Sequence, residues 1–256
     1  MSVARVFLGS LVKRRLATLF SGTAIVLGVA LGMAVQVVHD SALSEFGRGL
    51  RAMTGTADLL VVGPRGGFDE QLYEQLAARP EVRDISPIVE VEVRVAGGTG
   101  RQETLQLFGV DVFSLGGVTP ALFPKPAEGA DRLAALSGDS IFLSRAALAS
   151  LGLKVGNTLQ VPANDRLLSL RIAGDIPGSA DNRRLAVMDI AAVQAYFGKL
   201  GRLTRIDLRL AEGLSLDAAS PSLRAFLPAG VLLEPPDAAV GQAAAQRRVV
   251  GHPAAT

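Results

Sequence analysis

The feature that most constrains this chain is a stretch near its N-terminus, residues 16–38, that contains no charged side chain. Since an α-helix rises about 1.5 Å per residue, a run of this length can cross a bilayer core of about 30 Å. We therefore predict a transmembrane helix over 16–38. A cleaved signal peptide is the alternative, because Gly32-Met33-Ala34 has the small residues of a cleavage site. The apolar region of a signal peptide is usually only about 7–15 residues long, which favours the retained helix.

Basic residues flank this predicted span on its N-terminal side. Lys13, Arg14 and Arg15 precede it, and His39-Asp40 follow it. Lysine and arginine beside a membrane span remain in the cytoplasm. The three cations therefore predict a cytoplasmic, membrane-anchoring segment over 1–15, with the remainder of the chain on the other side of the membrane.

Small residues recur along the predicted span. Ala24, Gly28 and Gly32 are spaced four residues apart, which places them on one face of a helix. Such a face lets a second transmembrane helix approach closely, so we expect these residues to form a helix-packing site. The alternative is incidental glycine, which is common in membrane helices.

Composition argues against several classes of function. The sequence has no cysteine, so disulfides, thiolate catalysis and cysteine metal sites are excluded. Its two histidines, His39 and His252, lie far apart, which argues against a histidine triad or a zinc site. A net charge of +2 and 5% aromatic residues argue against a nucleic-acid surface. We expect no enzymatic activity, no bound cofactor, no metal and no nucleic-acid partner.

Two other patterns resemble elements of binding or catalytic sites. The loop Gly63-Pro64-Arg65-Gly66-Gly67 joins a predicted strand to a predicted helix, but it lacks the lysine and hydroxyl residue that close a phosphate-binding P-loop. Glu90 and Glu92 could be an acid and base pair, but their spacing places both on the polar face of a strand without a visible partner. We interpret the loop as a plain turn and the glutamates as part of a solvated sheet face.

The exported part begins and ends with a β-α-β pattern. An apolar strand over 57–62 and a helix over 70–78 lead into alternating valines and charged residues, a period of two that is typical of a half-buried strand. That strand turns at a glycine-rich loop and returns over 104–110. Near the end, a strand over 203–210 again alternates apolar with charged residues. A helix follows, for which Ser220 and Pro221 are the residue types of an N-cap and a first helical residue. A last strand covers 230–233.

The segment between these patterns, 113–202, is rich in proline and glycine at its start and then carries short strands and helices. Ser144 and Gly152 are the predicted caps of a helix over 145–151. A hairpin is predicted around Asn164-Asp165. We therefore predict an α+β protein: one N-terminal transmembrane helix and a split β-α-β, ferredoxin-like domain, with helices on one face of its sheet and a mostly β insert that projects from it.

Over roughly residues 10–245, the chain resembles the periplasmic core domain of MacB-like ABC transporter permeases, the group that carries FtsX-like membrane domains. The resemblance rests on short phrases in a shared order and not on one catalytic motif. These phrases are Arg14-Arg15-Leu16-Ala17-Thr18, Leu107-Phe108-Gly109-Val110-Asp111, Ser140-Ile141-Phe142-Leu143-Ser144, Leu151-Gly152-Leu153-Lys154-Val155-Gly156-Asn157, Met188-Asp189-Ile190, Ala195-Tyr196-Phe197-Gly198 and Leu203-Thr204-Arg205-Ile206-Asp207.

The resemblance implies a function in transport. Members of this family work as dimers with a separate cytoplasmic ATPase, which binds the ATP. ATP-driven motion is relayed through the helices to the periplasmic domain, which moves a substrate, a periplasmic protein or a lipoprotein. By this resemblance the chain is a single-pass protein of the bacterial inner (plasma) membrane, with its N-terminus in the cytoplasm and its bulk in the periplasm or outside the cell. Its expected partners are the cytoplasmic ABC ATPase subunit, a second copy or a related permease chain, and the membrane.

The resemblance also implies domain boundaries. The porter-like part is expected as two halves, 39–112 and 203–238, and the protruding part as the insert 113–202. Residues 239–256 are expected to be a stalk remnant and a C-terminal tail. The three later helices of the family are not in this sequence, so a fragment, a truncated product and a single-span relative are all consistent with it.

Three hypotheses follow for the function. The first is the N-terminal, non-enzymatic part of an ABC transporter permease. The alternative is a single-span, membrane-anchored extracytoplasmic binding or adaptor module with no transport activity of its own. A secreted carboxylate-based hydrolase is the third hypothesis; no motif supports it, and it would need a pocket with two converging acids of shifted pKa.

Overall fold

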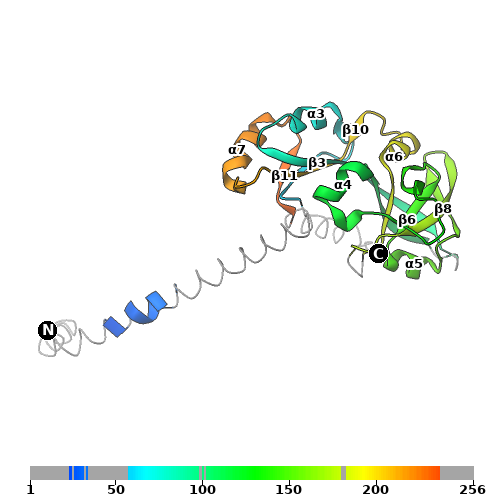
Figure 1. Cartoon of the computed structure of the whole chain (residues 1–256), viewed down its shortest axis with the longest axis horizontal. Coiled ribbons are helices and arrows are strands. Elements are labelled where there is room, and N and C mark those ends of the chain that lie inside the picture. The colour runs from blue at the N-terminus through cyan, green and yellow to red at the C-terminus, as the bar shows by residue number, and fades with distance from the viewer. Residues whose placement is uncertain are drawn as a thin grey trace, which may run out of the picture. The chain divides into compact units, whose positions relative to one another are not determined.

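The chain divides into two units, 1–53 and 54–256. The computed structural model describes residues 23–24, 26–31, 33, 57–97, 100, 102–179 and 183–236 (Figure 1). The predicted basic segment 1–15 and the predicted stalk remnant and tail from 239 to 256 therefore lie outside the described residues.

The second unit is a mixed α/β structure built on one large sheet (Figure 1). The strand order is β12-β1-β11-β3-β4-β9-β6-β8-β5, and β7 pairs with β8; β2 and β10 form a separate pair. The sheet is mixed because β4 and β9, and also β6 and β8, run parallel. The strands are β1 (Leu59–Val62), β2 (Phe68–Asp69), β3 (Val82–Ala96), β4 (Gln102–Val110), β5 (Lys125–Pro126), β6 (Ser140–Leu143), β7 (Thr158–Ala163), β8 (Arg166–Asp175), β9 (Leu185–Asp189), β10 (Arg202–Leu203), β11 (Arg205–Leu210) and β12 (Leu232–Glu234). The helices are α3 (Gln71–Ala77), α4 (Val112–Val118), α5 (Arg145–Leu151), α6 (Ile190–Tyr196) and α7 (Leu216–Phe226), with 3-10 turns η1 (Pro120–Leu122) and η2 (Ala134–Leu136).

Two β-α-β units form one end of this sheet. They are β1-α3-β3 and β11-α7-β12, and their strands interleave antiparallel in the order β12-β1-β11-β3, which is the order of a split β-α-β arrangement. Both helices cover the same face of the sheet. Leu72 and Leu76 of α3 and Ala219 and Leu223 of α7 pack in one core cluster with Val61 of β1.

The fifteen-residue strand β3 carries the sheet into the segment predicted as an insert. Its first part pairs with β11 and its second part with β4, and Ile88 is the residue where the partner changes, because it lies opposite both Arg205 and Val110. Beyond β4 the sheet continues through β9, β6 and β8. β7 contacts β3, so the far part of the sheet curls back toward β3. The boundaries at 113 and 202 stay predictions.

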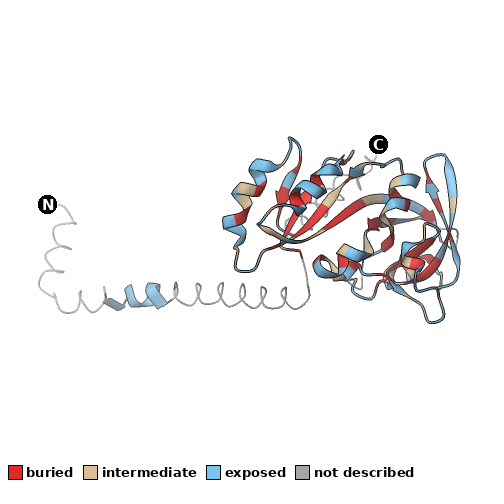
Figure 2. Ribbon diagram, turned by 45° about the horizontal axis from the view of Figure 1, so that its top comes forward, coloured by how far each residue is buried: buried red, intermediate tan, exposed pale blue. Residues whose placement is uncertain are grey.

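Most strands of the sheet contain buried residues (Figure 2), and their side chains form core clusters on both faces. On one face a single cluster joins α3 and α7 to α5 and α6. On the other face α4, η1 and η2 cover a second cluster that includes Ile88, Phe108 and Phe142. β1 is buried on both faces. The side chains of Leu59 and Val61 belong to the cluster on the first face, and that of Leu60, which points to the other face, packs with Val118 of α4.

Local structure within the predicted insert follows the sequence closely. Ser144 caps α5, where its hydroxyl accepts a hydrogen bond from the N–H of Ala147 at 3.2 Å. Gly152 ends α5 in the left-handed conformation, with φ of +64°. The hairpin β7–β8 turns at Asn164, which has φ of +51° and is one of the residue types that tolerate it. These three predictions are confirmed.

The predicted start of the last helix is wrong. α7 begins at Leu216, five residues earlier than predicted, and Pro221 lies inside it. The N-cap is Ser215, whose hydroxyl accepts a hydrogen bond from the N–H of Ala218 at 3.3 Å. The helix continues past the proline with Ala219 and Leu223 buried in the core, so tertiary contacts outweigh the local signal.

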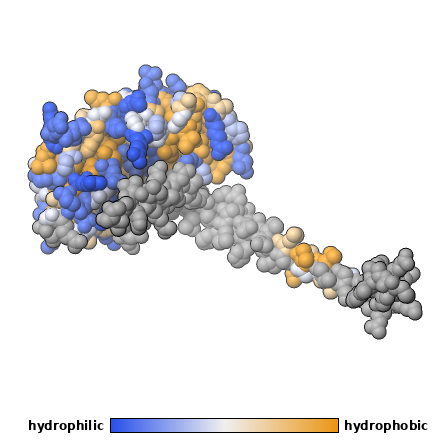
Figure 3. Space-filling model, turned by 180° about the vertical axis from the view of Figure 1, so that it is seen from behind, coloured by the Kyte–Doolittle hydropathy of each residue, from blue (hydrophilic) through white to orange (hydrophobic). Residues whose placement is uncertain are grey.

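In the first unit, residues 23–24, 26–31 and 33 are helical and exposed. Their surface is mostly apolar, and Figure 3 shows it as a hydrophobic patch. Its large apolar side chains are Val26, Leu27, Val29, Leu31 and Met33. Within the residues that can be described, none of the helices has both the length and the apolar character needed to span a membrane.

Candidate functional site

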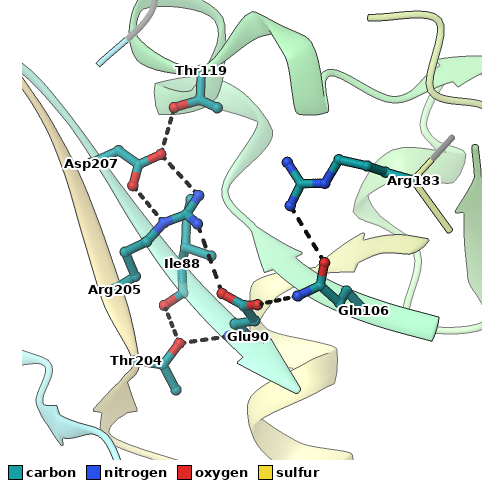
Figure 4. A network of polar contacts seen from close by, with 8 residues as sticks. All are labelled: Ile88, Glu90, Gln106, Thr119, Arg183, Thr204, Arg205 and Asp207. Atoms are coloured by element: carbon teal, nitrogen blue, oxygen red, sulfur yellow. Dashed lines mark hydrogen bonds and ion pairs between the residues drawn. The ribbon is translucent and has the colours of Figure 1, made fainter. Parts of the chain in front are cut away.

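The strongest candidate site in the described part of the chain is a polar network where β3 changes partner from β11 to β4 (Figure 4). Its residues come from segments far apart in the sequence that the sheet brings together. They are Ile88 and Glu90 of β3, Gln106 of β4, Thr119 after α4, Arg183 before β9, and Thr204, Arg205 and Asp207 at β11. We call this set the junction network.

The centre of the junction network is a buried ion pair within β11. Arg205 and Asp207 are two residues apart in a strand, so both side chains point to the same face of the sheet. Arg205 Nε lies 2.7 Å from Asp207 Oδ1, and Nη2 lies 3.1 Å from Oδ2. This two-bond geometry is the strong form of an arginine–carboxylate pair. The side chain of Asp207 is only 1% exposed.

A third contact ties this ion pair to the layer that covers it. The hydroxyl of Thr119, just after α4, donates to Asp207 Oδ2 at 2.6 Å. Both carboxylate oxygens of Asp207 therefore have partners. Nearby, Ser114 of α4 donates to the hydroxyl of Ser86 in β3 at 3.2 Å. α4 is thus attached to the sheet by hydrogen bonds as well as by apolar packing.

Glu90 extends the junction network across the change of partner. Its Oε2 lies 3.8 Å from Arg205 Nη1, and its Oε1 accepts a hydrogen bond from Gln106 Nε2 at 3.0 Å. Arg183 Nη2 in turn donates to Gln106 Oε1 at 3.4 Å. Side chains of β11, β3 and β4 are thereby linked in one chain of polar contacts.

The backbone is fixed at the same point. Ile88 O accepts from both the backbone N–H and the hydroxyl of Thr204, at 3.1 and 3.3 Å. The N–H of Glu90 donates to Thr204 Oγ1 at 2.6 Å. Thr204 lies between β10 and β11, so its hydroxyl extends the ladder just before β11 begins, where β3 changes its partner to β4.

The groups around Arg205 keep its guanidinium charged. Burial of the guanidinium acts to lower the pKa of Arg205, but the carboxylates of Asp207 and Glu90 outweigh it, so that pKa lies above its ordinary value. The guanidinium also stacks over the ring of Phe108, 5.5 Å from its centroid. Arg205 therefore stays charged at any physiological pH.

In the junction network the carboxylates are bound by other side chains of the same network. Arg205 and Thr119 already bind both carboxylate oxygens of Asp207. Arg205 and Gln106 bind both carboxylate oxygens of Glu90. General acid–base work needs a group that can reach a substrate proton. Among the residues with described positions, no group of three or more histidines or carboxylates is placed to hold a metal ion.

The sequence-predicted site residues are not brought together in the described structure. Lys13, Arg14, Arg15 and Gly32 lie outside the described residues. Ala24 and Gly28 are helical and exposed, and a Cβ added at Gly28 would meet no atom within 4 Å. The role of all six residues in anchoring and helix packing stays a prediction.

The two other patterns singled out in the sequence have structural roles. In the glycine-rich loop, Arg202 Nη2 donates to Gly67 O at 2.8 Å and Lys199 Nζ donates to Arg65 O at 3.2 Å, so the nearby cations bind loop carbonyls. Glu92 is exposed, as predicted for a solvated sheet face. Glu90 has 35% of its side chain exposed but binds Arg205 and Gln106, so the expectation that it has no partner is wrong. The cause is the neighbouring strand β11, which places Arg205 beside it.

Sequence analysis did not identify Arg205 and Asp207 as site residues, although one signal pointed to them. The apolar run Leu59–Val62 has no polar alternation, which is typical of a strand buried on both faces. A strand paired with it lies inside the sheet, where a charged side chain needs a partner. β11 is such a strand, and its Asp207 is 1% exposed and Arg205 18% exposed.

The chain is similar to known proteins of one family. A family model described as the MacB-like periplasmic core domain matches residues 18–226. An uncharacterized ABC transporter permease protein of Mycobacterium tuberculosis is 32% identical over 228 residues, which is 83% of this chain and 25% of that protein. This chain therefore spans about a quarter of the length of that curated relative.

A solved structure shows the same fold. The periplasmic region of MacB from Actinobacillus actinomycetemcomitans matches with a TM-score of 0.53 and 13% identity, covering 78% of this chain and 96% of that one. The extracellular domain of the noncanonic ABC-type transporter YknZ from Gram-positive bacteria matches with a TM-score of 0.49 and 10% identity, covering 70% of this chain and 100% of that one.

Proposed function

The chain belongs to the family of MacB-like periplasmic core domains of ABC transporter permeases, and from this premise we propose that it relays ATP-driven motion to a substrate or partner protein outside the membrane. The ATP is bound and hydrolysed by a separate cytoplasmic ABC ATPase subunit. This chain has no catalytic step of its own. Its sheet receives a displacement and transmits it to the far part of the domain.

The observation that supports this proposal best is the way the chain enters and leaves the sheet. β1 is the first strand after the N-terminal unit, and β12 is the last strand before the C-terminal residues. The two are paired antiparallel, with Leu60 opposite Glu234 and Val62 opposite Leu232. The start of β1 and the end of β12 therefore lie at the same end of neighbouring strands, so forces applied to the two connections act on one place in the sheet.

A displacement applied there has a continuous path to the far part of the sheet. β1 pairs with β11 along its whole length, and β11 pairs with β3. β3 continues without a break into the part that contains β4, β9, β6 and β8. Close-packed interiors have low compressibility and transmit strain. The junction network lies on this path where β3 loses one partner and gains the other, and it keeps the two parts of the sheet in register.

The remaining features of the proposal concern the membrane. A single transmembrane helix over 16–38 anchors the domain, with Lys13, Arg14 and Arg15 on the cytoplasmic side of a bacterial inner membrane. Ala24, Gly28 and Gly32 pack against a helix of a second copy or of a related permease chain. The moving part then acts on a periplasmic protein, a lipoprotein or another substrate.

Topology is tested first, on the full chain in bacterial membranes. Protease added from the periplasmic side should digest the domain and leave residues 1–15 protected with the span, as read by mass analysis. A soluble periplasmic product that begins near residue 35 would identify the stretch as a signal peptide and would contradict the anchored relay.

Motion is tested with the same chain assembled with its permease partner and ATPase in lipid nanodiscs. Because the sequence has no cysteine, Leu167→Cys places a unique spin label on the exposed hairpin β7–β8. We expect the distance between labels on two paired permease chains to change when ATP is added, and not with an ATPase variant that cannot hydrolyse ATP. A second pair of labels within one chain, Leu167→Cys on the hairpin and Gln75→Cys on the exposed side of α3, should keep its distance, because the sheet moves as a body.

The same measurement separates the relay from the adaptor hypothesis. An adaptor recruits its partner without a response to nucleotide, so the distance between chains would stay constant while the ATPase is active. That result would contradict the proposed relay. A change in the distance within one chain, with none between chains, would also contradict it, because the domain would deform instead of transmitting motion.

A further inference from the structure

An open groove, away from the junction network, runs along the outer side of α5, at the end of the sheet opposite α7 (Figure 1). The inner side of α5 is held in the core by Ala147 and Leu151. The groove has a volume of about 460 Å³, and binding pockets usually measure about 300–1,000 Å³. The residues that line it are Arg145, Leu148, Ala149, Gly152, Leu153 and Lys154.

The groove is built by the way α5 ends. The N–H of Gly152 donates to Ala149 O at 3.3 Å, and the N–H of Leu153 donates to Leu148 O at 3.1 Å. These are the two bonds of a Schellman motif, which turns the chain back so that the residue after the glycine packs beside the helix. Leu148 and Leu153 are both half-buried and pack against the core, so each leaves part of its side chain exposed in the groove.

Small residues make the groove hollow. Ala149 and Gly152 are both exposed, and a Cβ added at Gly152 would meet no atom within 4 Å. A surface without long side chains lets the backbone of a bound segment approach closely. The floor of the groove is therefore apolar and open to a segment of another chain.

A cation stands at each end of this apolar floor. Arg145 is the first residue of α5, and Lys154 follows the turn that ends it, where its backbone N–H donates to Asn157 Oδ1 at 2.8 Å. Both side chains are exposed, and within the part of the chain that the structure describes neither cation has a hydrogen-bond or ion-pair partner. None of the lining residues is acidic. The groove thus presents two free positive charges with apolar surface between them.

This charge pattern distinguishes between the possible occupants. A second copy of α5 would place cations against cations, which is unfavourable at an interface. A fatty acid or a lipid carries its anionic group at one end, so it would use one cation and leave the other unpaired. A peptide segment with two carboxylates and apolar side chains between them matches both ends of the groove and its floor. The pattern therefore favours an acidic, partly apolar segment of a partner protein.

We propose that the α5 groove binds a helical segment of a partner protein that presents leucine-like side chains between two carboxylates about two turns apart. Two turns of helix are about 11 Å long, and the seven residues of α5 span about 10 Å, so the carboxylates reach Arg145 and Lys154 together. The apolar side chains lie over Ala149 and Gly152, as in other cases where an amphipathic helix occupies a groove. The role of this partner as the substrate of the relay rests on the proposed function, whereas the binding itself does not.

A synthetic helical peptide tests the groove on the full chain in phosphatidylcholine nanodiscs, whose headgroups carry no net charge. The peptide presents two leucines between glutamates seven positions apart, all on one helix face. Fluorescence anisotropy of the labelled peptide, corrected with empty nanodiscs, measures its affinity. We expect saturable binding to the wild type and binding weaker by about tenfold or more in Arg145→Glu/Lys154→Glu, because both contacts become repulsive. Lys125→Glu/Arg166→Glu is the matched control: it reverses two exposed cations outside the groove and should change the affinity by less than about twofold, since salt screens distant charges.

Two further measurements separate the groove from general attraction of charge. A peptide with lysines in place of the glutamates should bind Arg145→Glu/Lys154→Glu and not the wild type, because specificity follows the reversed charges. Ala149→Trp leaves every charge in place but fills the hollow, so it should weaken binding of the acidic peptide by about tenfold. Circular dichroism should be the same in all variants, which verifies that the domain remains folded.

Absence of saturable binding to the wild type would overturn the proposal, as would undiminished binding to Arg145→Glu/Lys154→Glu or to Ala149→Trp. Labelling of residues 145–154 by a diazirine derivative of stearate, without binding of the peptide, would overturn it in favour of a lipid. Because peptide binding needs neither ATP nor the ATPase, the groove can fail this test while the relay stands, and the relay can fail while the peptide binds.

Discussion

Arg205 carries a positive charge into a part of the sheet that is covered on both faces. Its partner Asp207 is 1% exposed and has both oxygens occupied. Taking two charges out of water is costly, and their attraction offsets this only with good geometry and further hydrogen bonds, which Thr119 supplies here. The pair therefore adds little net stability compared with apolar residues of the same shape. Removing only one partner is more destabilising, because the other charge then lacks that partner inside the sheet.

Asp207→Ala is expected to lower the free energy of unfolding by about 3 kcal/mol, since Arg205 would keep only its longer contact with Glu90 in a mostly buried position. Thermal unfolding of the full chain in detergent micelles, followed by circular dichroism, measures the effect. The double variant Arg205→Met/Asp207→Leu is the control, and it should unfold nearer the wild type because no charge is left behind. An Asp207→Ala chain as stable as the wild type would show that the ion pair is not isolated from water.

Glu81 makes the stability of α7 depend on pH. Hydrogen bonds from Ser222 of α7 and from Arg79, with the nearby charge of Arg79, lower the pKa of its carboxyl below the ordinary value for glutamate. A carboxyl whose pKa is lower in the folded state stabilises that state above the unfolded-state value, and this contribution is lost as the pH falls through the folded-state value. Stability measured between about pH 6 and pH 3 should fall more steeply in the wild type than in Glu81→Gln. Equal slopes in the two chains would contradict the coupling.

The contact between β4 and α6 depends on a glycine. A Cβ at Gly109 would lie 2.8 Å from Val193 Cβ, closer than side-chain carbons pack, so the strand and the helix approach each other only because Gly109 has no side chain. α6 in turn is fixed by Asp189, whose carboxylate accepts from the N–H of Ala192 at 3.1 Å. The helix cannot slide to accommodate a methyl group without giving up this cap.

Gly109→Ala is expected to destabilise the domain by about 1–3 kcal/mol, the usual cost of overpacking a core. The same change made together with Val193→Ala should cost clearly less than the sum of the two single changes, because the second substitution removes the atoms in the way. Urea unfolding of the four chains of this cycle measures the coupling. Strict additivity would show that the strand and the helix move apart freely.

On one face of its sheet, the second unit has a single core cluster that spans both ends of the sheet. The cluster on one face of the sheet joins Leu76 of α3 to Val193 of α6 through side chains of β3 and β4, such as Val93 and Leu107. β3 itself belongs to both ends of the sheet. Because packing and hydrogen bonds cross the change of partner, neither end has a complete core without the other.

The two ends should therefore unfold together, in one transition. The sequence has two tyrosines, Tyr73 in α3 and Tyr196 in α6, so each end carries one reporter. With fluorinated tyrosine in both positions, the two fluorine resonances should shift with the same urea midpoint. Two separate midpoints would show that the ends are independent domains.

Local signals in the sequence predicted local structure well. Ser144 and Gly152 frame α5, and Asn164 turns the hairpin β7–β8, because a cap or a turn depends on residues within a few positions of itself. The start of α7 was not predicted, since Ser215 and the buried Ala219 outweigh the proline signal at Pro221. The junction network was not predicted either, because Thr119, Gln106 and Arg205 meet only through strand pairing.

The sequence by itself determined the alternating and apolar strands, the β-α-β pattern at each end of the domain and the resemblance to the permease family. These follow from periodicity and short phrases, which are properties of neighbouring residues. Only the tertiary structure decided that β3 exchanges β11 for β4 at Ile88, that α4 covers the second face, and that Asp207 is buried. Pairing partners and burial depend on residues about a hundred positions apart, and the energy of such contacts exists only once the sheet has closed around them.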